Sequence, residues 1–190
     1  MNAQITANAI SGRATGALFF TGFGALWLVL ALYAREQLSA RALALVAGGA
    51  LVLVASALWL RSKAKGLPQA EEDPAIKRNF RRINLVQWAA VAVVAFSFAR
   101  LHIDAYVMSA ITAIVGLHFL PLARLFRYKL HYLSGAVLVA WAAASVFLFP
   151  AERLPGATAL GTGAILWTSA FATLVLAVAR LRPRLEMARD

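Results

Sequence analysis

Long apolar stretches separated by short polar segments form the pattern of this chain. Six stretches hold no Asp, Glu, Lys or Arg, and each is close to the roughly 20 apolar residues that a helix needs to cross a bilayer. The pattern predicts an all-α fold, a polytopic six-transmembrane-helix bundle that forms a single integral membrane domain over residues 1–190. The predicted spans are residues 14–34, 42–60, 83–99, 105–123, 132–150 and 157–179.

Composition supports a membrane protein and removes one alternative. Hydrophobic residues make up 62% of the chain and the mean hydropathy is +0.72, which is more than the core of a soluble domain of this length can bury. The formal net charge of +11 would suit a nucleic-acid partner. The basic residues are scattered between apolar runs, however, so we expect the lipid bilayer and no nucleic acid as the partner. Cysteine is absent, which excludes disulfides and thiolate ligands.

The basic residues are distributed unevenly between the two sides of the predicted bundle. Fifteen of the nineteen Lys and Arg residues fall in the N-terminal segment, the second and fourth loops and the C-terminal tail, whereas the other three loops share four. Because the richer side of a membrane protein normally faces the cytoplasm, we predict that both termini are cytoplasmic.

The longest loop, between the second and third spans, ends in a helix start and a basic cluster. Asp73 followed by Pro74 is typical of an N-cap and a first helical position, so the third helix is predicted to begin about two turns before the bilayer. The basic cluster is predicted either to contact the head groups of anionic lipids, at about 1 kcal/mol per residue, or only to set the topology. Its members are Lys77, Arg78, Arg81 and Arg82.

Uncharged polar residues provide the candidate site within the spans. No charged residue lies deep in a predicted span, which disfavours ion coupling through carboxylates. Asn84 and Gln87 share one face of the third span because they are three residues apart, and His118 in the fourth span lies at similar depth. Gly116 permits a close approach of helices, and Pro121 can kink the fourth helix. These five residues are predicted to line a small binding pocket open to the cytoplasm. The alternative is that the amides and the imidazole only join helices, at roughly 0.6 kcal/mol per hydrogen bond.

The histidines leave one cofactor alternative open. A bis-histidine haem would require His118 and His131 to face each other at similar depth, whereas His102 belongs to the outer face. We expect no cofactor and no metal site. An intramembrane enzyme would have to depend on His118 alone, so enzymatic activity is not favoured.

Glycines predict where helices approach each other closely. Most of those in the first, second and sixth spans are predicted to serve contacts within the bundle. The alternative for Gly12-x-x-x-Gly16 is the seam of a homodimer. Pro155-Gly156 is predicted to form a tight external turn before the sixth span.

One part of the chain resembles a known family. From the third span to the start of the fifth, an Asn-x-x-Gln motif at Asn84 and Gln87 precedes a Gly-x-His-x-x-Pro motif at Gly116, His118 and Pro121. Over this stretch, about a quarter of the chain, the sequence resembles a family of small bacterial multi-pass membrane proteins of unknown function. The resemblance implies that the five motif residues act together and that the protein lies in the bacterial inner (plasma) membrane. It implies no activity.

Two functions from different classes follow from these patterns. The first is transporter-like handling of a small solute or lipid, for which we expect a water-accessible cavity that reaches mid-membrane between the third and fourth helices. The second is a non-transporting accessory or sensor protein that binds a partner through helix packing.

Overall fold

The computed structural model describes residues 7–65 and 73–187. For residues 182–187 it describes the backbone only. In these ranges the chain is all-helical and contains no strand. Six helices are long and apolar enough to cross a membrane, which confirms the predicted fold class. They are α1 (Ala7–Ala34), α2 (Ala40–Ala64), α3 (Pro74–Arg100), α4 (Val107–Leu125, preceded by the short 3-10 helix η1, Asp104–Tyr106), α5 (Leu130–Leu148) and α6 (Leu154–Met187).

The predicted start of α3 is confirmed in detail. Asp73 lies in an extended conformation before the helix, and its carboxylate accepts a hydrogen bond of 2.8 Å from the amide of Ala75. Pro74 occupies the first helical position, where no intrahelical partner for its missing N–H would exist. α3 thus begins nine residues before the predicted span, because this cap satisfies backbone donors that the apolar pattern does not reveal.

The turn predicted at Pro155-Gly156, between α5 and α6, was wrong. α5 ends at Leu148. The external turn lies at residues 150–153, and Pro155 and Gly156 belong to the first turn of α6 instead. Proline suits the first turn of a helix because the amide groups there have no helical acceptor.

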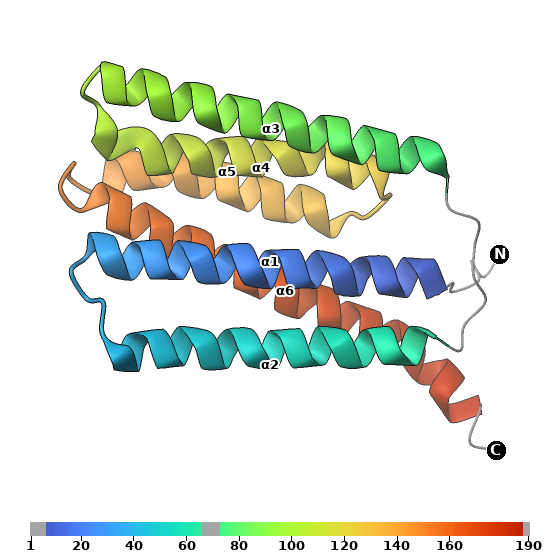
Figure 1. Ribbon diagram of the computed structural model, residues 1–190. Coiled ribbons are helices and arrows are strands. Elements are labelled where there is room, and N and C mark those ends of the chain that lie inside the picture. Colours follow the sequence, from blue (N-terminus) through green and yellow to red (C-terminus); the bar gives the residue numbers. More distant parts are fainter. Residues whose placement is uncertain (1–6, 66–72, 188–190) are drawn as a thin grey trace.

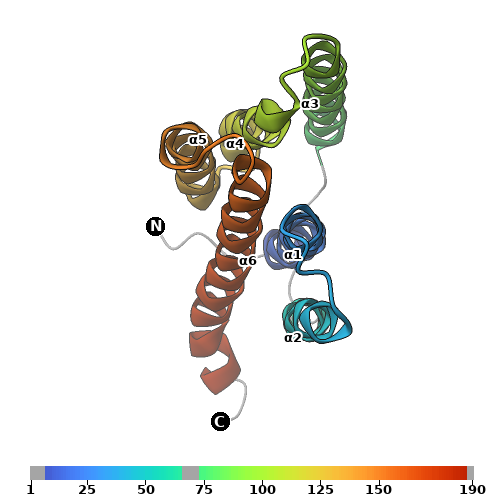
Figure 2. The same cartoon turned by 90° about the vertical axis from the view of Figure 1, so that its left-hand side faces the viewer.

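Helix α6 is the centre of the bundle. It runs obliquely between α1 on one side and the α4–α5 pair on the other (Figures 1 and 2), and it also contacts α2. The outer helices are α2, which packs on α1, and α3, which packs mainly on α4. No residue of α3 is fully buried, so most of its surface is available to lipid.

Glycines lie at two close helix crossings. A Cβ atom added to Gly116 of α4 would lie 2.8 Å from the carbonyl oxygen of Gly135 on α5, and one added to Gly163 of α6 would lie 3.0 Å from the carbonyl oxygen of Gly24 on α1. Gly12, by contrast, has no atom within 4 Å of such a Cβ, and neither does Gly16. Among the glycines for which contacts within the bundle were predicted, Gly24 and Gly163 make them, whereas Gly12, Gly16, Gly22 and Gly48 have no atom within 4 Å of an added Cβ.

Buried hydroxyl groups join α4, α5 and α6, and the sequence pattern did not reveal them. The Thr158 hydroxyl lies 3.1 Å from that of Ser109 and 3.0 Å from that of Ser145, so that three helices meet at one point. Two further pairs, each with oxygens 2.8 Å apart, link α6 to α4 and to α5. Such hydrogen bonds stabilise helix association where apolar contacts give no advantage over lipid. The pairs are Thr112 with Thr162, and Ser134 with Ser169.

Helices α1, α3 and α5 begin, and α2, α4 and α6 end, at the same end of the bundle (Figure 1). This end carries the Lys77–Arg82 cluster and the basic residues around Arg124, and we refer to it as the basic end. Its placement in the cytoplasm stays a prediction of the positive-inside rule.

Candidate functional site

A lateral groove separates α1 from α3 at the basic end. α3 packs against α4 and makes almost no contact with α1, which leaves a groove with a volume of about 700 Å³. In the end-on view α3 lies beside α4 and apart from α1 (Figure 2). The groove is lined by Phe19 of α1 and by Pro74, Lys77, Arg78, Phe80, Arg81, Asn84 and Trp88 of α3.

The lining of this groove changes in character along α3. Lys77, Arg81, Asn84 and Trp88 follow the i, i+4, i+7, i+11 spacing of one helix face, and at 1.5 Å per residue they extend over about 16 Å. The face thus passes from cations through an amide to an aromatic ring. Phe19, at 56% exposure, faces the same groove from α1. None of the described residues that line the groove is acidic, so this part of the groove is suited to a molecule with an anionic end and an apolar remainder.

The aromatic end of the groove is held in place by a contact across it. The rings of Phe23 on α1 and Trp88 on α3 have centroids 6.4 Å apart and are tilted by 45°. Trp88 remains 56% exposed, so the indole is available to a ligand as well as to this contact. The groove therefore has an aromatic end at Trp88, opposite the cations at the start of α3.

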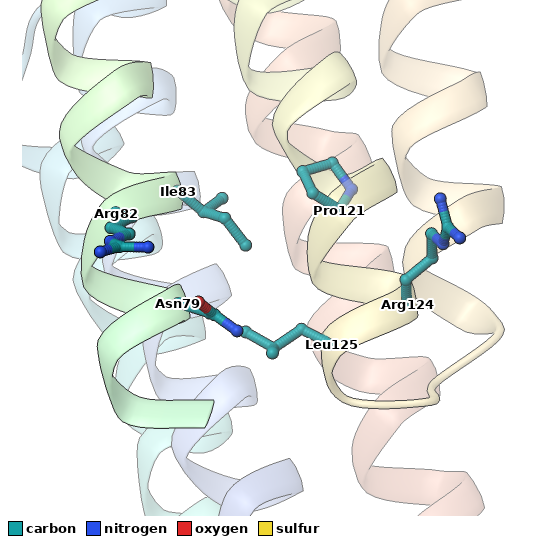
Figure 3. A pocket seen from close by; sticks show the side chains of 6 residues that line it. All are labelled: Asn79, Arg82, Ile83, Pro121, Arg124 and Leu125. Atoms are coloured by element: carbon teal, nitrogen blue, oxygen red, sulfur yellow. The ribbon is translucent and has the colours of Figure 1, made fainter. Parts of the chain in front are cut away.

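The four predicted head-group residues fall on two sides of α3. All are exposed, but only Lys77, Arg78 and Arg81 line the groove. Arg82 lines a separate cavity of about 400 Å³ between α3 and α4. Figure 3 shows this cavity with its six lining residues, which are Asn79, Arg82, Ile83, Pro121, Arg124 and Leu125.

The cavity between α3 and α4 lies where the sequence predicted one, but it is shallow. Its α3 residues fall within the first ten of that helix, and its three α4 residues lie among the last five of α4. It therefore stays at the basic end and does not reach the middle of either helix. Of the predicted pocket residues, only Pro121 lines it.

The remaining predicted pocket residues do not lie in one common site. Asn84 donates a hydrogen bond of 2.8 Å from Nδ2 to the carbonyl of Phe80 in its own helix and lines the groove. Gln87 is half-buried. The imidazole of His118 lies within hydrogen-bonding reach of the backbone of Ile83. In the described part of the chain no hydrogen bond joins His118 to either amide, so the contacts do not bring the motif residues together into one site.

Gly116 and Pro121 have local roles in α4. Gly116 is buried against Gly135 and Val139 of α5, which makes it a packing residue. Pro121 lies inside α4, which continues without interruption to Leu125, although proline removes one backbone donor from the helix.

Aromatic rings surround both inner histidines. The ring of His131 packs on Phe20, Phe119 and Tyr128 at centroid distances of 5.7, 5.7 and 5.0 Å, and His118 also contacts Phe119, at 5.8 Å. Nδ1 of each histidine is buried and has no hydrogen-bond partner. Among the described residues no three His, Cys, Asp or Glu side chains are grouped so that they could hold a metal ion.

Comparisons with known proteins add no evidence on the function of the site. No family model, curated protein or solved structure matches the chain. The fold defines the class, which is that of multi-pass α-helical membrane proteins, and the groove between α1 and α3 is the feature within it best suited to bind a ligand.

Proposed function

We propose that this protein binds an anionic phospholipid in the groove between α1 and α3. The observation that carries the proposal is the face of α3 on which Lys77 and Arg81 precede Asn84 and Trp88 within one groove. A phospholipid has the same order of groups, with a phosphate, then polar ester groups, then apolar chains. We place the protein in the bacterial inner membrane and the groove in its cytoplasmic leaflet, which the family resemblance and the excess of basic residues support.

Head-group charge, and not the acyl chains, should determine which lipid binds. The chains are surrounded by apolar groups both in the bilayer and in the groove, so their transfer gains little free energy. Each basic residue near the membrane surface contributes about 1 kcal/mol of attraction to an anionic lipid. Three such residues give about 3 kcal/mol, which corresponds to a preference of about 100-fold for an anionic over a zwitterionic lipid.

The test compares two triple variants of equal charge. In K77Q/R78Q/R81Q the cations of the groove are removed, whereas R61Q/K63Q/K65Q removes three exposed cations of α2 at the same end of the bundle. Native mass spectrometry of the full-length protein would measure retention of phosphatidylglycerol against phosphatidylcholine. We expect the first variant to lose most of the preference and the second to keep it. Equal losses in the two variants would show that the preference reflects net charge only, and the groove would not be a binding site.

The transporter-like activity predicted from the six spans stays a prediction beyond this binding step. The lining residues other than Trp88, which lies at the middle of α3, belong to the basic half of α1 and α3. A lipid that enters the groove from the side would therefore meet residues of one leaflet only. Fluorescent-lipid exchange between the leaflets of proteoliposomes would show whether the bound lipid is also moved.

A second candidate, a protein that binds a partner or a second copy through helix packing, is supported by a separate observation. Gly12 and Gly16 face open space in the monomer, so the predicted dimer seam is not used for intramolecular contacts. Cross-linking in lipid should give dimers that G12L/G16L abolishes and that G48L, at another glycine facing open space, leaves intact. Dimers that survive G12L/G16L would remove this candidate.

A further inference from the structure

Arg13 places a cation between helices at the basic end of the bundle. It lies on α1 and is half-buried, and its guanidinium carbon is 5.4 Å from the ring centroid of Tyr128, in the loop between α4 and α5. Arg180 of α6 is near enough for its positive charge to act on Arg13. A cation–π contact covers one face of a guanidinium, but the five N–H donors lie in its plane and still require acceptors.

The carboxylates with described side chains do not supply those acceptors. Glu36, Asp104 and Glu152 lie in segments at the opposite end of the bundle, and Asp73 caps α3. None of them forms an ion pair with Arg13. Arg13 is partly withdrawn from water and Arg180 is exposed; two like charges near each other attract an anion to the space beside them.

Three buried polar atoms without partners lie in the same region. They are Oη of Tyr128, Nδ1 of His131 and Oγ1 of Thr173. The rings of Tyr128 and His131 are 5.0 Å apart, and Thr173 is 1% exposed. Buried polar groups without a partner are rare in native structures and point to a group that is bound there.

Helix registers place Thr173 at the level of Arg13 and His131. Helices α5 and α6 are antiparallel, and Ser134 bonds to Ser169. His131 lies three residues before Ser134, and Thr173 lies four residues after Ser169. These two residues are therefore at about the same level. On α1 and α6, Gly24 lies opposite Gly163, so Arg13, eleven residues before Gly24, is level with the residues about eleven after Gly163. α1, α5 and α6 therefore bring these groups to one depth.

From this arrangement we infer a binding site for a phosphate group, formed by Arg13 and Arg180 with the hydroxyls of Tyr128 and Thr173 and the imidazole of His131. Arginine supplies charge and paired N–H donors, which match two phosphate oxygens. The two hydroxyls donate to further oxygens. The bound group would link α1, α6 and the loop between α4 and α5.

This site is separate from the groove between α1 and α3. Arg13 is seven residues from Phe20 and so shares its face of α1, whereas Phe19, which lines the groove, points about 100° away. Phe20 packs on His131 and Phe119. The inference therefore does not depend on the proposed lipid groove.

Thermal unfolding of the full-length protein in a neutral detergent provides the test. Sodium phosphate is compared with sodium chloride at equal ionic strength, and in a second arm phosphatidic acid is compared with phosphatidylcholine. We expect the phosphate-bearing ligand to raise Tm in a saturable way. A response to inorganic phosphate identifies a free-phosphate site, and a response only to phosphatidic acid identifies a lipid head group as the source.

Four variants separate the site from general charge effects. R13Q should abolish the shift in Tm, and T173V, which keeps the side-chain shape, should weaken the apparent affinity at least fivefold even if R13Q fails to fold. With inorganic phosphate as the ligand, R61Q, at an exposed arginine of the same end, should keep the full shift, as should K77Q/R78Q/R81Q, whose cations belong to the lipid groove. The inference is overturned if neither ligand raises Tm in the wild-type protein, if T173V responds like the wild type, or if only K77Q/R78Q/R81Q loses the response.

Discussion

The crossing of α4 and α5 at Gly116 allows a quantitative prediction. A methyl group at Gly116, introduced by Gly116→Ala, would lie 2.8 Å from the Gly135 carbonyl oxygen and 2.8 Å from Cγ2 of Val139. Ordinary van der Waals contacts begin near 3.4 Å, and the carbonyl belongs to a helix backbone that cannot move aside alone. The two helices must therefore separate along the crossing.

The expected magnitude is the balance of two effects. Overpacking of a well-packed site costs typically 1–3 kcal/mol, whereas Gly→Ala in a helix gains up to about 1 kcal/mol from propensity. We expect Gly116→Ala to lower the free energy of unfolding by about 1–2 kcal/mol. Gly12→Ala, where nothing lies within 4 Å, should leave it unchanged or raise it slightly.

Unfolding of both variants by sodium dodecyl sulfate, followed by tryptophan fluorescence, measures this difference. Lipid retention measured on the same samples distinguishes packing from ligand contact. If Gly116→Ala proves as stable as Gly12→Ala, the close approach of α4 and α5 is refuted. If stability is kept but lipid retention is lost, Gly116 belongs to a binding site, as the motif with His118 implies.

Three further predictions concern other parts of the bundle. Thr158→Val should lower the free energy of unfolding by about 1 kcal/mol, because it removes bonds to two buried hydroxyls. Ser56→Ala, which removes an exposed bond within α2, should have little effect in the same titration. Equal losses in the two variants would contradict the special role of the buried cluster. His118→Phe should retain phosphatidylglycerol binding, since the imidazole packs on Phe119 away from the groove, and native mass spectrometry would reveal a loss that assigns His118 to the site. Reporter fusions should place both termini in the cytoplasm and the loop at Arg153 outside, and a terminus on the outer side would overturn the predicted orientation.

The number and type of helices could be predicted because they follow from the thickness of the hydrocarbon core. Charge-free stretches of about 20 residues are a strong signal, and the start of α3 was also predictable because the cap at Asp73 is local. Pro155 was misread because proline marks both turns and first helical turns. Hydropathy could not decide between these positions.

The candidate site was harder to predict because it depends on the rotation of each helix. Ile83 and Asn84 are neighbours in sequence, yet one lines the cavity towards α4 and the other the groove towards α1. The sequence predicts how deep a residue lies along its span. It does not determine which neighbouring helix that face of the helix contacts. The hydroxyl cluster around Thr158 was missed for a related reason, since serine and threonine are common in spans and only their meeting across helices distinguishes them.

The central position of α6 has a consequence for how the protein is made. α6 follows α1 to α5 along the chain, and it is the one that contacts α1, α2, α4 and α5. The helices before α6 must therefore enter the bilayer without the neighbour that joins them, and this bundle is completed only after α6 has been made. A chain released before its sixth span would leave two incomplete groups of helices in the membrane, with the buried hydroxyls of α4 and α5 exposed to lipid.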